Sequence, residues 1–195
     1  MQDVYKPCPC GSGKKIKFCC LQKIVGNDPR EALKQAAAFP VYECGVMENW
    51  GDSGLASIYV VRQMPNLRYV YGMYIVDYYC LGLKNTFADA NVKWERVKEL
   101  KCRVEQQYAL VNFPYEDARS LILGGIDYAK ALGFEPNEDW KYSKYIVEYD
   151  RPYEAKFEFG KDGKPYYIQW PYDDVRTVMS KLRSQSAGYM LGGPA

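Results

Sequence analysis

Four of the seven cysteines lie within thirteen positions near the start of the chain, in the run Cys8-Pro9-Cys10-Gly11-Ser12-Gly13-Lys14-Lys15-Ile16-Lys17-Phe18-Cys19-Cys20. A segment this short cannot bury a hydrophobic core, so bound metal must supply its folding free energy. Four thiolates are the ligands of a closed tetrahedral Zn²⁺ site. The glycines at positions 11 and 13 allow a tight turn that returns the second cysteine pair to the first. We therefore expect Zn²⁺ at Cys8, Cys10, Cys19 and Cys20.

A pair of disulfides is the alternative use of these four cysteines. The first residues show no basic start with an apolar stretch, and the longest apolar run, residues 69–83, is too short and too polar to span a bilayer. We therefore expect a cytoplasmic protein, in which thiols stay reduced and serve as metal ligands. A second alternative remains open, in which the zinc only caps the fold and binds no partner.

The cysteine segment resembles the SEC-C motif, the Cys-x-Cys-x8-Cys-(Cys or His) zinc module found at the C-terminus of the SecA preprotein translocation motor. The resemblance covers residues 6–21 and includes the ligand spacing, the run from Gly11 to Lys15, and the basic Lys17. It implies that Cys8, Cys10, Cys19 and Cys20 are zinc ligands and that the module docks on protein partners or ribosomes. The motor's ATPase is absent here and the motif stands at the other end of the chain, so translocation activity is not implied.

The charge distribution suggests a boundary after the cysteine segment. The whole chain has 26 basic and 24 acidic residues, too balanced to indicate a general nucleic-acid binder. Residues 1–25 contain five lysines and one aspartate, a net charge of +4, whereas the remaining residues carry −2. We therefore expect a zinc module at 1–25 and one domain at 26–195. Within the module, Lys14, Lys15 and Lys17 are the candidate partner-binding residues.

The sequence of residues 26–195 predicts an α+β domain, in which antiparallel strands pack with helices. Asp28 and Pro29 form a helix start, with Glu31 placed for a capping box. Residues 55–62 and 69–76 predict a β-hairpin. Residues 157–160 and 166–170 predict a second one. Apolar periodicity predicts helices over 94–108, 116–132 and 175–182. The second of these helices contains Gly124-Gly125, and each glycine lowers helix stability by about 1 kcal/mol relative to alanine. We therefore expect close backbone packing at this pair to compensate.

Several catalytic classes are excluded or weakly supported. The chain has no histidine, which excludes Ser-His-Asp and Cys-His catalysis and histidine-ligated metals. Gly13-Lys14 lacks the first glycine and the Ser or Thr of a phosphate-binding loop, so no nucleotide site is expected. Cys80 has no histidine to act as a base, and we expect it, Cys44 and Cys102 to be buried, inert thiols.

Two classes of function therefore remain. The leading hypothesis is a non-enzymatic docking or adaptor protein that contacts a protein or ribonucleoprotein partner through its zinc module. The alternative is a hydrolase or nuclease in which carboxylates of the main domain gather a metal ion and the zinc module serves as a targeting tag. The candidate carboxylates, none with diagnostic spacing, are Asp77, Asp127, Glu135, Asp139, Asp173 and Asp174.

Overall fold

A five-stranded antiparallel sheet forms the centre of the protein. This computed structural model describes residues 5–7, 12–15, 18–19, 28–184 and 188–192. The strands of the sheet follow the spatial order β4-β3-β2-β1-β5. They are β1 (Val41–Met47), β2 (Leu55–Gln63), β3 (Tyr69–Asp77), β4 (Gly82–Val92) and β5 (Leu110–Asn112). The α+β class expected from the sequence is confirmed.

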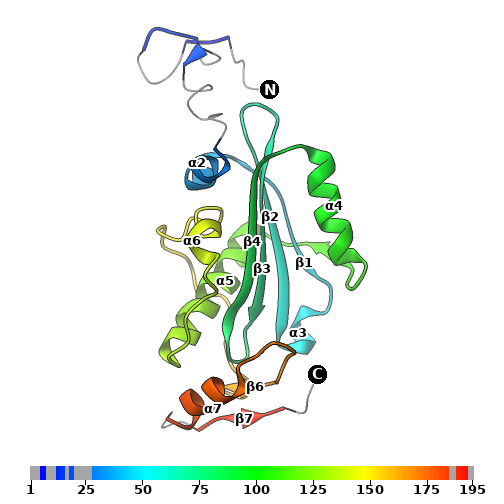
Figure 1. Cartoon of the computed structure of the whole chain (residues 1–195), viewed down its shortest axis with the longest axis vertical. Helices are drawn as coiled ribbons and strands as arrows, with labels where there is room; N and C mark the ends of the chain where they lie inside the picture. The colour runs from blue at the N-terminus through cyan, green and yellow to red at the C-terminus, as the bar shows by residue number, and fades with distance from the viewer. Residues whose placement is uncertain (1–4, 8–11, 16–17, 20–27, 185–187, 193–195) are drawn as a thin grey trace.

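Helices cover both faces of this sheet (Figure 1). One face packs against α2 (Pro29–Lys34), α5 (Tyr115–Ala131) and the turn after α6 (Trp140–Ser143), and it holds the largest buried apolar cluster. The opposite face packs against α4 (Trp94–Glu105), whose Val97 and Leu100 contact strand tyrosines. Two short elements, η2 (Ala36–Ala38) and α3 (Trp50–Ser53), lie in the connections beside β1.

The predicted helices and the first hairpin are confirmed. β2 and β3 pair from Leu55↔Asp77 to Gln63↔Tyr69 around a turn at Pro65. The side chain of Asp28 accepts a hydrogen bond from the Arg30 N–H at 2.9 Å, and Pro29 is the first residue of α2. Gly133 ends α5 with φ +84°, the left-handed conformation that glycine adopts at a C-cap.

The second predicted hairpin is wrong. Lys161 and Lys164 form an isolated bridge around the expected turn, but residues 157–159 join no strand. Their aromatic rings pack on other parts of the protein, because Phe157 contacts Trp50 and Phe113 and Phe159 contacts Tyr128. β6 (Tyr166–Tyr167) pairs instead in parallel with β7 (Met190–Leu191), and α7 (Val175–Arg183) packs in the same small cluster.

The Gly124-Gly125 pair confirms the close packing expected of it. A Cβ atom on Gly124 would lie 2.7 Å from the Phe159 ring, and one on Gly125 would lie 2.8 Å from a Val76 methyl. Val76 is fully buried in the sheet, whereas Phe159 is half-buried at the surface. The two glycines therefore let α5 approach β3 on one side and the 152–159 segment on the other.

We expect Gly125→Ala to destabilise the protein by about 1–2 kcal/mol. The helix-propensity gain of about 1 kcal/mol is outweighed by overpacking against Val76, since the buried strand cannot retreat. Gly124→Ala is the matched control and should cost less, because the Phe159 ring has room to move outward. Urea unfolding of both variants measures the difference; equal or increased stability of Gly125→Ala would contradict the packing argument.

Candidate metal centre

The structure describes only part of the predicted zinc module. Of the four predicted ligands, Cys19 belongs to the described residues, and Cys8, Cys10 and Cys20 lie outside them. Of the predicted partner-binding lysines, Lys14 and Lys15 are described and Lys17 is not. Within the part of the chain that the structure describes, no group of three Cys, Asp or Glu side chains is placed to hold a metal ion. The tetrathiolate site therefore remains a prediction.

The described residues of this segment form a loop that doubles back. Pro7 pairs with Lys15 in an antiparallel bridge, which places the residue before the first cysteine beside the middle of the loop. Gly13 adopts φ +70°, which a residue with a side chain rarely reaches. The Phe18 N–H then donates to the Lys15 carbonyl at 2.9 Å and forms the turn that leads into Cys19. The bridge therefore returns the chain at Lys15 to the residue that precedes the cysteines.

Cys19 has the surroundings of a metal ligand. Its side chain is buried, with 8% exposure, although residues 12–15 and Phe18 around it are exposed. The Ser12 hydroxyl lies 2.9 Å from the Cys19 sulfur. If the sulfur is a thiolate, that hydroxyl is the donor, and hydrogen bonds of this kind orient and stabilise sulfur ligands. The donor chemistry around Cys19 fits Zn²⁺.

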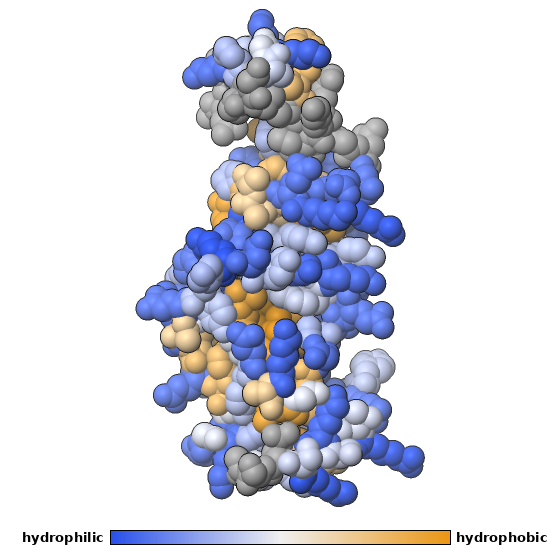
Figure 2. Space-filling model, turned by 90° about the vertical axis from the view of Figure 1, so that its left-hand side faces the viewer, coloured by the Kyte–Doolittle hydropathy of each residue, from blue (hydrophilic) through white to orange (hydrophobic). Residues whose placement is uncertain are grey.

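The two described lysines present positive charge beside this loop. Lys14 and Lys15 are both exposed, and the Lys15 ammonium lies 5.8 Å from the centre of the Tyr5 ring. Figure 2 shows strongly hydrophilic residues on the described part of this lobe, at the end of the molecule. Charge at an exposed loop of fixed geometry favours encounter with anionic surfaces.

The cysteines outside the module differ from one another. Cys44 and Cys80 are buried, as expected, and burial raises the pKa of Cys44 to about 12 and that of Cys80 further still. Both thiols are therefore protonated and unreactive near neutral pH. Cys102 is exposed on α4, so its expected burial is wrong. Residues on one face of a helix are three or four positions apart. Cys102 has neither spacing from the buried Val97 and Leu100, so its side chain lies on another face of α4.

The candidate carboxylates do not converge on one place. Asp77 is buried and accepts hydrogen bonds from the N–H groups of Tyr79 and Cys80. Asp127 accepts from the Tyr153 hydroxyl. Asp173 pairs with Lys84 at 2.7 Å, Asp174 caps α7, and Asp139 stands at the start of α6. Most of these side chains hold turns, helix ends and segment contacts. Asp77 and Asp173 both interact with Lys84, and among the described residues no three metal-binding side chains gather.

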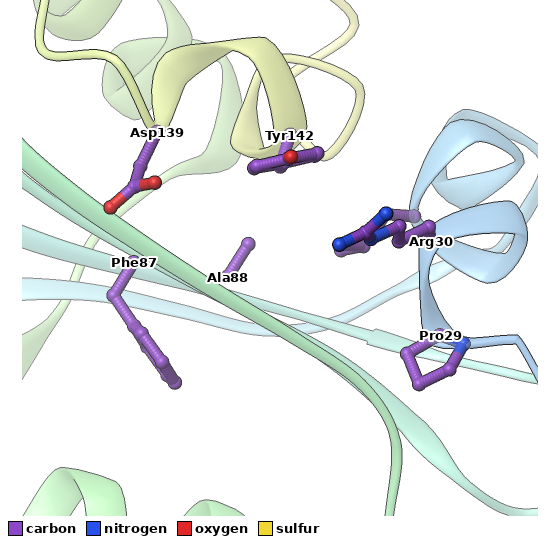
Figure 3. A pocket seen from close by; sticks show the side chains of 7 residues that line it. Pro29, Arg30, Phe87, Ala88, Asp139 and Tyr142 are labelled. Carbon is purple, nitrogen blue, oxygen red and sulfur yellow. The ribbon is translucent and has the colours of Figure 1, made fainter.

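A cleft that the sequence analysis missed lies between α2, α6 and β4 (Figure 3). It has a volume of about 360 Å³ and is lined by Pro29, Arg30, Leu33, Phe87, Ala88, Asp139 and Tyr142. Arg30 reaches in from α2 and Tyr142 from α6, while Ala88 on β4 forms the floor and Phe87 points to the other side of the strand. A second hollow of about 440 Å³ adjoins it, shares Arg30, Leu33 and Tyr142, and extends to Lys141 and Tyr145.

The sequence contains a repeated pattern that could have indicated this cleft. The run Lys141-Tyr142-Ser143-Lys144-Tyr145, followed by Tyr149, repeats a cation–tyrosine pair at a spacing of three. That spacing brings like residues to one side of a helical turn. Only the structure shows that α2, more than a hundred residues earlier in the chain, places Arg30 against the same tyrosines.

Comparison with known proteins assigns neither a family nor a function to this chain, since no family model, no curated protein and no solved structure matches it. Among the described residues, no helix combines the length and the apolar character needed to cross a bilayer. Function must therefore be argued from the geometry and chemistry of the chain itself.

The buried Asp77 carboxyl predicts a pH-dependent stability. Burial raises its pKa from 3.8 to about 6, against the opposing effects of Lys84 and neighbouring backbone N–H groups. The folded protein therefore holds this proton more tightly than the unfolded chain. The resulting stabilisation is fully present below about pH 4 and is lost as the pH rises to about 6.

We expect Asp77→Asn to remove this dependence, because its carboxamide oxygen still accepts the N–H bonds but takes up no proton. Relative to this variant, the unfolding free energy of the wild type should fall by up to about 3 kcal/mol between these pH values. Urea unfolding at a series of pH values measures both proteins. Parallel curves across the window would show that Asp77 does not titrate as its burial requires.

Proposed function

We propose that this chain is a non-enzymatic docking protein whose N-terminal segment is a SEC-C-like zinc module that contacts a protein or ribonucleoprotein partner. The observation that carries the proposal is the cysteine spacing, with Cys8 and Cys10 separated from Cys19 and Cys20 by a glycine-rich basic loop. The Pro7–Lys15 bridge, the left-handed Gly13 and the buried Cys19 with its Ser12 contact support it, because each is what a tight metal-binding loop requires.

The proposed zinc would have a structural role. Cys8, Cys10, Cys19 and Cys20 would hold it, and four thiolates leave no open position for a substrate or water. They also leave the centre with a charge of −2, which Lys14, Lys15, Lys17 and loop N–H groups would offset. The metal would fix the loop backbone and so hold the lysines in one arrangement. We place the protein in the cytoplasm, where cysteines remain reduced.

A docking role is supported over an enzymatic one by the main domain. Among the described residues, the carboxylates that a hydrolase or nuclease would need form no group of three, and Asp77, Asp173 and Asp174 are used in a turn, an ion pair and a helix cap. The exposed Lys14 and Lys15, in contrast, are presented on the loop next to the predicted ligands. Of the partners considered, a ribosomal one fits this localised positive charge best.

We expect one zinc ion per chain in protein purified under reducing conditions. Cys19→Ser/Cys20→Ser should lose it, because two sulfur ligands cannot hold zinc as four do. Cys102→Ser is the matched control, since this exposed thiol lies outside the module and its loss should leave the zinc content unchanged. Elemental analysis measures the three proteins. Absence of zinc from the wild type, or disulfides between the module cysteines, would contradict the proposed centre.

We expect binding to ribosomes that weakens as salt rises. Each lysine–phosphate contact contributes a slope of about −0.7 to −0.9 in a plot of log affinity against log salt. Lys14→Glu/Lys15→Glu/Lys17→Glu, with its zinc retained, should bind more weakly and with a shallower slope. Co-sedimentation with ribosomes over a salt series is the measurement.

The matched control carries the same charge change on α4, at three exposed positions: Lys93→Glu/Lys98→Glu/Arg103→Glu. It should behave like the wild type. If the wild type and the module variant co-sediment alike at every salt concentration, or if neither co-sediments at low salt, the ribosomal form of the proposal fails.

A further inference from the structure

Three cations and three tyrosines form one continuous surface where α2 meets α6 and the turn that follows it. We call this surface the cation–tyrosine groove; its residues are Arg30, Lys141, Tyr142, Lys144, Tyr145 and Tyr149. It includes the two adjoining hollows of about 360 and 440 Å³, with Tyr142 lining both. Figure 2 looks onto this side of the molecule and shows a mainly hydrophilic surface.

Each cation lies near the face of a tyrosine ring. The Arg30 guanidinium is 5.9 Å and the Lys141 ammonium 5.0 Å from the centre of the Tyr142 ring. Lys144 lies 5.2 Å from the Tyr145 ring and 4.3 Å from the Tyr149 ring. Tyr145 and Tyr149 meet edge to face, with ring centres 5.7 Å apart. Positive charge and aromatic faces therefore alternate along the groove.

The three groove cations are not held in ion pairs. Among the described residues, neither Arg30 nor Lys141 nor Lys144 forms a salt bridge. Two acidic residues also line the second hollow: Glu31 pairs with Lys34 at 2.7 Å, and Asp28 accepts a hydrogen bond from the Arg30 backbone N–H at 2.9 Å and keeps its negative charge. Asp139 lines the first hollow and points into the cleft (Figure 3).

The groove is held in place from beneath by two buried arginines. Arg62 of β2 donates to the Ile146 carbonyl at 2.7 Å, and Arg119 of α5 donates to the Val147 carbonyl at 2.9 Å. Both residues are almost completely buried, with 2% and 1% exposure. Since residues 146 and 147 stand between Tyr145 and Tyr149, these bonds fix the turn that carries both rings. A ligand would therefore meet a preformed surface and lose little affinity to ordering it.

We propose that the cation–tyrosine groove binds single-stranded RNA, with phosphates on Arg30, Lys141 and Lys144 and unpaired bases against the exposed parts of the tyrosine rings. Alternating cations and aromatic faces are the elements with which proteins hold single strands. An acidic peptide would satisfy the cations but would make no use of the ring faces. This inference rests on the proposed function. It identifies RNA as the component of the ribonucleoprotein partner that the main domain contacts.

The test is fluorescence anisotropy of a short labelled oligouridine titrated with the intact chain at low salt. Lys141→Glu/Lys144→Glu should weaken binding about tenfold or more, because it reverses two phosphate-binding charges. Lys98→Glu/Arg103→Glu makes the same charge change at exposed sites of α4 and should shift the affinity by about twofold at most. The comparison separates a site from general charge attraction.

The tyrosine variants test stacking. Tyr142→Leu keeps an apolar side chain but removes the ring face, and should weaken binding about fivefold or more. Tyr142→Phe keeps the ring and should bind like the wild type. A double-stranded RNA of matched length, whose bases are already stacked, should bind more weakly than the single strand.

The proposal is overturned if the wild type does not bind the oligouridine, if the two charge variants weaken it equally, or if Tyr142→Leu and Tyr142→Phe behave alike. Equal binding of duplex and single strand would also overturn it. Competition by polyglutamate as effective as that by RNA would indicate an acidic protein partner instead. Failure here is distinguishable from failure of the proposed function, because the wild type and the Lys14→Glu/Lys15→Glu/Lys17→Glu variant share the same groove, and the difference in their ribosome co-sedimentation reports on the module lysines.

Discussion

A buried guanidinium near the end of the central strand connects the segments that cover one face of the sheet. Arg62 stands on β2 with its side chain directed into the main apolar cluster, where an unpaired charge would cost several kcal/mol. Its donors are used by the carbonyls of Phe39 and Ile146, the hydroxyl of Tyr115 and the carboxylate of Glu148. Since these partners come from the end of the first helical segment, the start of α5 and the turn after α6, a single side chain connects them all to the sheet.

Arg119 extends this network along α5. It reaches the carbonyls of Val147, Glu148 and Arg151, and it pairs with Glu116 at 2.9 Å. The segment from 146 to 151 has no strand or long helix of its own, so its backbone carbonyls need partners from elsewhere. Two arginines supply these partners, which explains how an irregular segment holds a defined shape on the surface. Removing Arg62 would take a donor from the Phe39 and Ile146 carbonyls and from the Glu148 carboxylate, and removing Arg119 would take donors from the carbonyls of residues 147, 148 and 151.

The outer strand β4 is protected against pairing with another strand. The Thr86 N–H is bound by the Asn85 side chain at 2.8 Å, and the Ala90 N–H by the Asp89 side chain at 2.9 Å. Asn137 donates to the Leu83 carbonyl further along the same strand. These contacts occupy groups that an incoming strand would use. Contact with a partner is therefore favoured at side chains near β4, including the groove beside Ala88, rather than at its backbone.

Sequence patterns predicted the elements with strong periodicity and missed those determined by tertiary contacts. The β2–β3 hairpin and helices α4, α5 and α7 follow from apolar spacing alone. β4 was missed because the polar residues Asn85, Asp89 and Asn91 interrupt its apolar pattern. β6 was mispaired because its partner β7 lies more than twenty residues further on. The predicted metal ligands required only local spacing, whereas the groove required Arg30 and Tyr142 to meet across the fold, which no local pattern contains.

The distribution of charge explains how a nearly neutral chain can favour an anionic partner. Lys14 and Lys15 stand on the N-terminal lobe, and Arg30, Lys141 and Lys144 stand on the adjoining part of the main domain (Figure 1). Elsewhere on the surface, some acidic residues are engaged in ion pairs, such as Glu43 with Lys101 and Asp117 with Lys156. Because screening in physiological salt limits interactions to about 8 Å, an approaching phosphate responds to these local groups and not to the net charge of +2. The proposed binding to anions would thus depend on where these cations stand.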